Sequence, residues 1–379
     1  MAGAHADQER PVAVFHVISS TSVGGAEMML ERFLSHHASA RHTMVISMTT
    51  AGAVGRRLQG LGIPVVSLDM RSLAGVGRGL WKYFRLLRKH RPACVVAWMY
   101  HANLLVSLYG RFSGATRIVW NIRCGLSDYC AWPLMRKIIF WCCRFVSGGP
   151  RFIVYNSIKS MRQHVAQGFP VRNGTVVYNG FDALGFTRVK NVFLRAELGI
   201  PADAFLVGSF GRNFPVKRMA DLLQVAVKLL PRDCPVQLLY VGRNFDTAEF
   251  RDAIRRSGLA TLVHVVPEVP SLIPYYGILD AFCLCSEAEG FPNVVGEAVY
   301  SGVPVFCSDV SDLKEVFLEG WQISPVGDIE GLASSAYRIF RMGQQERNIL
   351  AERQKSAYLQ RTDIDTVVST LADAFWGSR

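Results

Sequence analysis

One repeated pattern constrains the fold most: a short apolar run, a turn rich in glycine or polar residues, then an amphipathic helical stretch. The first unit has an apolar run at 12–18, followed by Gly24, Gly25 and a helix whose apolar side chains continue to Leu34. Further apolar runs of strand length follow at 44–48, 65–68, 94–98, 117–121 and 152–156. Such alternation predicts a parallel sheet with helices on both faces.

The same pattern restarts near Ala204. Its apolar runs lie at 205–210, 236–241, 263–266, 281–285 and 303–307. Turn residues dominate the weakly periodic segment between the two sets, and we place the domain boundary within it, at 181–192. We therefore predict an α/β protein with three parts, at 1–185, 186–350 and 351–379. The first two are Rossmann-like domains with a cleft between the carboxyl ends of their strands, and the third is a helix that packs back on the first domain.

Composition narrows the class of protein. Half of the 379 residues are hydrophobic, which excludes global disorder. The formal net charge of +12 favours an anionic partner, and nucleic acid, an anionic membrane and a phosphorylated substrate all satisfy it. Nine cysteines without a CxxC pair fit reduced thiols in a cytosolic protein better than disulfides or a zinc site. We find neither a signal peptide nor a membrane span, so the expected location is the cytoplasm.

The strongest motif is SEAEGFPNVVGEAVYSGVPV at 286–305, in which seven residues separate Glu289 from Glu297. Pro292 suits the first residue of a helix, which places both glutamates near the carboxyl end of the sheet. The backbone N–H groups at 291–294 can then donate to hydroxyl or phosphate groups in the cleft. A carboxylate accepts two hydrogen bonds side by side, which suits a ribose cis-diol. Spacing alone fits a helix cap with solvent-facing glutamates equally well, but the surrounding residues favour a binding site.

A second motif, GSFGRNFPVKRMADLL at 208–223, brings Arg212 and Lys217 to one loop after a strand. A helix is expected to start near Lys217 or Met219. Two cations at this place can bind a diphosphate and neutralise the charge that develops on it as a leaving group. Ordinary solvated basic residues are the alternative interpretation.

The third motif, SSTSVGGAEMML at 19–30, has Gly24 and Gly25 at a helix start. Glycine allows the backbone to approach a ligand closely, and a helix N-terminus favours anions. A plain tight turn explains this motif equally well when it is taken alone.

Together these motifs resemble the retaining glycosyltransferases of family 4, which have the GT-B fold. That family typically has GGAE in its first loop, as at 24–27 here, and its Glu-x7-Glu signature matches Glu289 and Glu297. The resemblance extends over about 12–333. Pro267, Glu268, 309–312 and Trp321 depart from the family pattern, and no function is carried over to them.

The resemblance implies a role for each matching residue. Glu289 would contact the transferred sugar, Glu297 the ribose, and His101 would lie near the reacting carbon, although a buried structural histidine is the alternative for His101. The residues expected to act in catalysis are Glu289, His101, Arg212 and Lys217. Those expected to bind the substrate are Gly24, Gly25, Arg212, Lys217, Glu289, Gly290, Phe291, Pro292, Asn293 and Glu297. No metal and no cofactor are expected, since the cations would do the work of a metal ion, and the Asp363-x-Asp365 triplet fits a helix cap.

Two basic, aromatic helices at 80–91 and 131–145 fall in the first domain. Aromatic anchors beside lysine and arginine are typical of interfacial helices on anionic lipid. A core-facing helix with a charged outer face is the alternative. We favour the membrane interpretation because the charge has one sign, and we expect peripheral attachment to the inner face of a membrane.

The resulting hypothesis is a metal-independent, retaining transferase acting on a UDP- or GDP-linked sugar. Its acceptor would be a lipid-linked or other glycan in polysaccharide or glycolipid biosynthesis, bound on the side of the first domain. A nucleotide-sugar epimerase of the same architecture is the alternative enzyme. A basic protein that binds nucleic acid is a remote third, because neither an RNA-binding motif nor a helix-turn-helix is recognisable.

Overall fold

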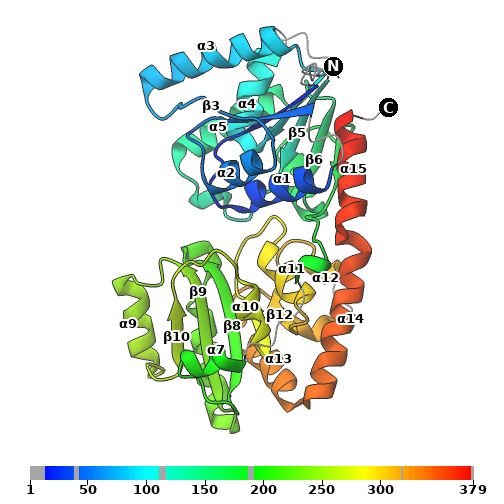
Figure 1. Ribbon diagram of the computed structural model, residues 1–379. Coiled ribbons are helices and arrows are strands. Elements are labelled where there is room, and N and C mark those ends of the chain that lie inside the picture. The colour runs from blue at the N-terminus through cyan, green and yellow to red at the C-terminus, as the bar shows by residue number, and fades with distance from the viewer. Residues whose placement is uncertain (1–12, 38–41, 111–116, 187–191, 317–318, 377–379) are drawn as a thin grey trace, which may run out of the picture.

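The computed structural model describes residues 13–37, 42–110, 117–186, 192–316 and 319–376, and it contains two parallel β-sheets (Figure 1). The first sheet has seven strands in the order β3-β2-β1-β4-β5-β6-β7. These are β1 (Val14–Ile18), β2 (Thr43–Ser47), β3 (Val65–Ser67), β4 (Cys94–Trp98), β5 (Arg117–Ile122), β6 (Phe152–Tyr155) and β7 (Gly174–Val176). The helices between them are α1 (Gly25–His36), α2 (Ala53–Gly60), α3 (Leu73–His90), α4 (Met99–Gly110), α5 (Leu134–Val146) and α6 (Ile158–Ala166).

The second sheet has six strands in the order β10-β9-β8-β11-β12-β13. They are β8 (Phe205–Arg212), β9 (Val236–Arg243), β10 (Val263–Val266), β11 (Ala281–Leu284), β12 (Val305–Ser308) and β13 (Ile323–Ser324). The helices of this half are α7 (Val192–Glu197), α8 (Asp221–Leu229), α9 (Ala248–Ser257), α10 (Ile273–Gly277), α11 (Asn293–Tyr300), α12 (Leu313–Val316) and α13 (Ile329–Arg341). Strand order reverses between β1 and β4 and between β8 and β11, so both sheets are doubly wound, as predicted.

The predicted strands are all present, with small shifts at their ends. The strand expected at 303–307 begins at Val305, because Gly302 has a positive φ of 70° and Pro304 has no N–H to donate to a neighbouring strand. Two further strands, β7 and β13, were not predicted, and they have only three and two residues. Runs that short carry no periodicity.

The chain ends on two consecutive helices that connect the halves of the molecule. α14 (Gln344–Thr362) lies along the second domain, and α15 (Ile364–Trp376) lies along the first (Figure 1). Phe375 packs on Phe33 of α1 with ring centroids 5.2 Å apart, so α15 completes the core around β1. Asp363 caps α15, since its carboxylate accepts a hydrogen bond from Thr366 N at 3.1 Å, which confirms its interpretation as a cap. The domain limits at residues 185 and 350 stay predictions.

The segment that follows β7 crosses between the domains beside the junction of α14 and α15. The N–H of Phe181 donates to the carbonyl of Thr362 at 2.8 Å, so the two segments that pass between the domains touch each other. Among the described residues, no helix is both long enough and apolar enough to span a bilayer.

Candidate functional site

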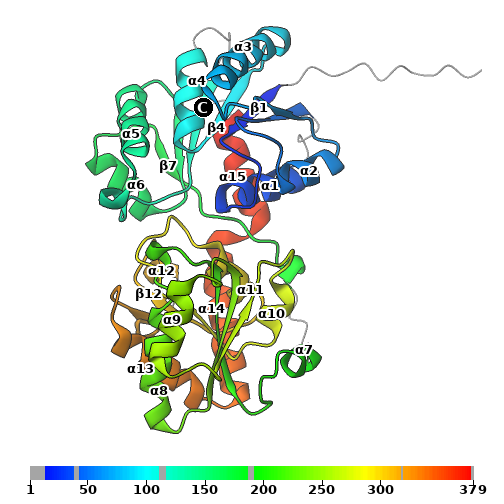
Figure 2. The ribbon, with the colours of Figure 1, turned by 90° about the vertical axis from the view of Figure 1, so that its left-hand side faces the viewer.

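Figure 2 shows the two domains one above the other. A cleft of about 1170 Å³ lies between them. Loops at the carboxyl ends of strands from both sheets line it. All eleven residues singled out from the sequence are in this lining: Gly24, Gly25, His101, Arg212, Lys217, Glu289, Gly290, Phe291, Pro292, Asn293 and Glu297. Their convergence follows from the parallel sheets, because parallel strands end at one edge.

The cationic loop of the second domain begins where β8 ends. Gly211 has φ of 132° and Gly242 has φ of 145°, values at which any other residue is strained. A Cβ on Gly242 would collide with the carbonyl of Gly211, so the two strand ends approach as closely as glycine allows. Lys217 follows in a single 3₁₀ turn, Pro215–Lys217. The expected helix starts later, at Asp221, because Arg218 takes a left-handed conformation with φ of 48° and interrupts it.

Lys217 and Glu289, predicted separately, form an ion pair. Lys217 Nζ lies 2.6 Å from Glu289 Oε1, and Ser286 Oγ donates to the same oxygen at 2.7 Å. Both charged side chains are mostly buried, at 24% and 11% exposed. Arg212, by contrast, has no carboxylate within 4 Å in the described part of the chain and lies 5.4 Å from the Phe214 ring. Its charge is therefore available to an anion.

The loop that follows Glu289 touches the first domain. A Cβ on Gly290 would lie 2.6 Å from Asn156 Nδ2 and 2.8 Å from the carbonyl oxygen of Arg123, so only glycine fits. Pro292 caps α11 and is not its first residue, a shift of one position from the prediction. Across the described residues, the N–H groups of Asn293 and Val294 have no protein partner, and they start a helix whose N-terminus favours anions.

Glu297 already has partners that were not predicted. Arg32 Nη2 donates to its Oε1 at 2.9 Å, and the Tyr276 hydroxyl donates to its Oε2 at 3.3 Å. The Arg32 guanidinium also lies 4.5 Å from the Phe181 ring centre and donates to the Gly180 carbonyl. The sequence could have indicated Arg32, because it follows Gly25 by seven residues and therefore lies two turns further along the same face of α1. A carboxylate has about four acceptor positions, so these bonds leave room for hydroxyl donors.

His101 lies in the first turn of α4 and faces the cleft. Burial, and then the charge of Arg136, lower the pKa of His101, which keeps its imidazole neutral at pH 7. The enclosed histidines of the first domain are instead His16, which accepts from Trp98 Nε1 at 3.1 Å, and His164. His101 is thus not one of the fully buried histidines, and its role in the reaction remains a prediction.

Two positions where the sequence departs from the family pattern also have partners. Asp312 accepts from the N–H of Lys159 at 2.9 Å and from that of Ile158, so it caps α6 across the domain boundary. Glu268 pairs with Arg243 at the rim of the cleft. In the described segments, no three histidine, cysteine, aspartate or glutamate side chains converge as metal ligands would.

Arg123 was not predicted at all. It follows β5 directly, lies in the cleft wall and is 8% exposed. The sequence could have indicated Arg123, because it lies just after a predicted strand. Ligands bind in such sheets at the edge where the strands end.

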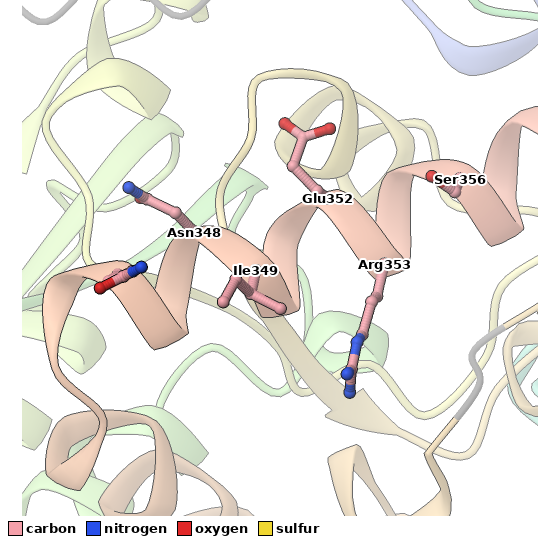
Figure 3. A pocket seen from close by; sticks show the side chains of 6 residues that line it. Asn348, Ile349, Glu352, Arg353 and Ser356 are labelled. Carbon is pink, nitrogen blue, oxygen red and sulfur yellow. The ribbon is translucent and has the colours of Figure 1, made fainter.

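A second hollow, of about 460 Å³, lies on the outer face of α14 (Figure 3). Every residue lining it comes from that one helix: Gln345, Asn348, Ile349, Glu352, Arg353 and Ser356. Figure 3 shows these side chains projecting from a single helix without converging on one point. The cleft is therefore the better candidate for a functional site.

Comparison with known proteins gives a consistent result. Residues 202–341 match the family model of the glycosyl transferases group 1. The chain is 24% identical over 193 residues to the N-acetyl-alpha-D-glucosaminyl L-malate synthase of Bacillus anthracis, covering 50% of each protein, so it spans only half the length of that relative. It is 21% identical over 319 residues to the capsular polysaccharide biosynthesis glycosyltransferase CapH of Staphylococcus aureus, covering 80% of this chain and 83% of CapH.

Among solved structures, Anabaena Alr3699/HepE in complex with UDP and glucose superposes with a TM-score of 0.84. The match covers 96% of this chain and 98% of HepE at 20% sequence identity, which establishes the fold. The chain therefore has the GT-B fold that the motifs implied.

Proposed function

We propose that this protein is a retaining, metal-independent glycosyltransferase that uses a UDP- or GDP-linked sugar. Its acceptor is a lipid-linked or other glycan in polysaccharide or glycolipid biosynthesis. One observation carries the proposal: Arg212, Lys217, Glu289 and Glu297 line one wall of the cleft beside the free N–H groups of α11. HepE, which shares the fold, has been solved with UDP and with UDP-glucose.

The chemistry of this wall suits a nucleoside diphosphate sugar. The unpaired Arg212 and the N–H groups of α11 receive the diphosphate. Lys217 joins them when the anion draws it from Glu289, which frees the Glu289 carboxylate to accept hydrogen bonds from the sugar hydroxyls. The ribose hydroxyls donate to Glu297. As the bond to the sugar breaks, Arg212 and Lys217 stabilise the growing charge on the leaving diphosphate, the role a metal ion plays elsewhere.

The alternatives have less support. An epimerase would need no acceptor, whereas the relatives from Staphylococcus aureus and Bacillus anthracis are named as a glycosyltransferase and a synthase. A nucleic-acid-binding protein would be expected to keep its cations free for phosphates. Four of the seven arginine and lysine side chains that line the cleft are instead ion-paired: Arg32–Glu297, Arg57–Glu31, Lys217–Glu289 and Arg243–Glu268.

Peripheral attachment to an anionic membrane on its cytoplasmic face is part of the proposal. α5 exposes an apolar stripe to solvent, formed by Leu134, Met135, Ile138, Trp141 and Phe145. Phe145 is 92% exposed, which is unusual for an aromatic residue unless a partner covers it. Lys137 and Arg144 on the same helix supply positive charge for an anionic lipid surface. Phe140 and Cys143 fill the opposite, buried face.

The test is a panel of nucleoside diphosphates and nucleotide sugars, scored by the shift in the thermal unfolding midpoint. A ligand that binds only the native state stabilises it by about 2.7 kcal/mol at a hundredfold excess over its Kd. UDP or GDP compounds should raise the midpoint of the wild type. Lys217→Met should reduce the shift, whereas the control Lys228→Met, on the outer face of α8, should not. The proposal fails if no member of the panel protects the wild-type protein.

A further inference from the structure

Arg123 is a buried cation with unused hydrogen-bonding capacity. Its Nη1 donates to the Val177 carbonyl at 2.6 Å, but Nε and Nη2 have no partner among the described residues. No carboxylate lies within 4 Å of it in that part of the chain. Burial lowers the pKa of Arg123 to about 9, which still leaves the side chain charged at pH 7.

Leaving such a group unpaired is costly. A buried charge without a counter-ion, and buried donors without acceptors, each disfavour the folded state unless a ligand supplies what is missing. The arginine fork presents parallel N–H groups that match two oxygens of a phosphoryl or carboxylate group. Arg123 lines the cleft, but its Nε and Nη2 are buried, so the guanidinium must turn toward the opening to meet a bound anion.

Arg136 provides a second cation on the same wall, where its side chain forms a hydrogen bond with the Cys124 thiol. Its guanidinium stacks on the Trp132 ring at 3.5 Å and it lines the cleft, again with no carboxylate within 4 Å among the described residues. Arg136 lies in the first turn of α5, where the N–H groups of Leu134 and Met135 have no partner in the described structure. Asp128 also lines this side of the cleft, so the two arginines outnumber the carboxylates there.

Arg123 and Arg136 lie on the first domain, whereas Arg212 and Lys217 lie on the second. The cleft thus offers anion-binding groups on both walls. From the first turn of α5, the exposed stripe of Ile138, Trp141 and Phe145 continues along the helix. Arg136 lies on the same face of α5 as Phe140 and Cys143, opposite this stripe. A ligand with a phosphoryl group at the arginines would therefore have to lead its hydrocarbon round the first turn of α5, where Leu134 and Met135 are exposed, to cover the stripe.

We propose that Arg123 and Arg136 form a second anion site, separate from the donor site, that binds the phosphoryl group of the acceptor. The apolar stripe on α5 indicates that this group is linked to a lipid chain. The inference rests on the proposed transferase function and names the acceptor class for the same cleft. Arg123 and Arg136 are assigned to binding the acceptor, with no part in bond breaking.

Calorimetry on the full chain tests this site with farnesyl diphosphate as the probe and UDP at saturation, so that the donor site is filled. The comparison ligands are farnesol, which has the hydrocarbon without charge, and inorganic pyrophosphate, which has the charge without hydrocarbon. The variants are Arg123→Met, Arg123→Lys and Arg136→Gln. Arg162→Gln is the matched control, because it removes the same charge from the same domain, at an exposed position of α6 outside the cleft lining.

We expect farnesyl diphosphate to bind the UDP-saturated wild type more tightly than either comparison ligand. Arg123→Met and Arg136→Gln should each weaken this binding about 10- to 100-fold, as expected for a lost hydrogen bond to a charged group. Arg123→Lys should fall between, and Arg162→Gln should bind like the wild type. UDP affinity should be the same in every variant.

A structural role for Arg123 predicts a different result. If the residue only held the fold, Arg123→Met would lower the unfolding temperature and leave the affinity of the folded protein unchanged. If it binds an anion, the substitution removes an unpaired buried charge, and the melting temperature stays at or above that of the wild type.

Several results would overturn the proposal. The proposal is wrong if farnesyl diphosphate does not bind the UDP-saturated protein, or if UDP displaces it. It is also wrong if both Arg123→Met and Arg136→Gln bind farnesyl diphosphate with wild-type affinity. Equal affinity for pyrophosphate would overturn the lipid source while supporting the anion site. If UDP itself does not bind, the proposed donor function has failed. The anion site is then tested separately, by measuring farnesyl diphosphate binding in the absence of nucleotide.

Discussion

The ion pair between Arg32 and Glu297 joins the two domains across the base of the cleft, and its strength can be predicted. Arg32 Nη2 lies 2.9 Å from Glu297 Oε1, and the two side chains are 12% and 14% exposed. Two unit charges about 4 Å apart attract by about 4 kcal/mol at an effective dielectric constant of 20. Desolvation offsets part of this attraction. The net value should lie between the roughly 0–1 kcal/mol of exposed pairs and the 3–5 kcal/mol lost on breaking a fully buried pair.

A double-mutant cycle with Arg32→Met and Glu297→Gln isolates the interaction. Methionine keeps a hydrocarbon chain against Phe181, and glutamine keeps the shape of the carboxylate. Each single variant should lose about 2–3 kcal/mol of unfolding free energy, and the coupling energy should be about 1–2 kcal/mol. The assay is urea unfolding of the four proteins, with equal slopes required so that all of them expose the same surface.

The control cycle uses Arg71 and Asp69, an ion pair with side chains 63% and 58% exposed. Solvent screening should hold its coupling below about 0.5 kcal/mol. If the Arg32–Glu297 coupling is no larger than that of the control, then this ion pair does not hold the domains together and the reasoning from burial is wrong.

Four further predictions follow from the site, the surface and the core. Transfer activity should survive EDTA, because Arg212 and Lys217 supply the positive charge; complete loss that magnesium restores would contradict this. NMR of the first-formed product should show the anomeric configuration of the donor retained, and an inverted linkage would remove the chain from the retaining group. Sedimentation with anionic vesicles should be reduced by Trp141→Ser with Phe145→Ser, and unaffected by a serine at the exposed Val171; equal sedimentation of all three would leave α5 without a membrane role. Burial lowers the pKa of His16 to about 3 and that of His164 to about 4, so both are neutral in the native state, while the unfolded chain takes up protons below about pH 6.5. The unfolding free energy should therefore be highest above pH 6.5 and fall between pH 6.5 and 4 by up to about 1.4 kcal/mol per pH unit for each histidine, and unchanged urea midpoints at pH 7.5 and 5 would refute this.

Local sequence determined the architecture and one wall of the cleft. Apolar runs alternating with amphipathic stretches specify parallel sheets, because each element must bury its apolar face. Parallel strands all end at one edge, so residues that follow strands, such as Arg212 and Glu289, could be placed in the cleft before any contact was known. Glu297 could be added because it lies about one turn after the start of the helix, near the same edge of the sheet.

Only the tertiary structure decided how charges in the cleft are paired. Arg32 and Glu297 are 265 residues apart, and Asp312 caps a helix that starts 154 residues earlier. Arg123 lies in no recognisable motif, yet two of its donors are buried without a partner among the residues that the structure describes. Contacts between segments so distant leave no periodic trace in the sequence. They depend on where the two domains meet. Burial at that interface brings some charged side chains to a partner and leaves others available to a ligand.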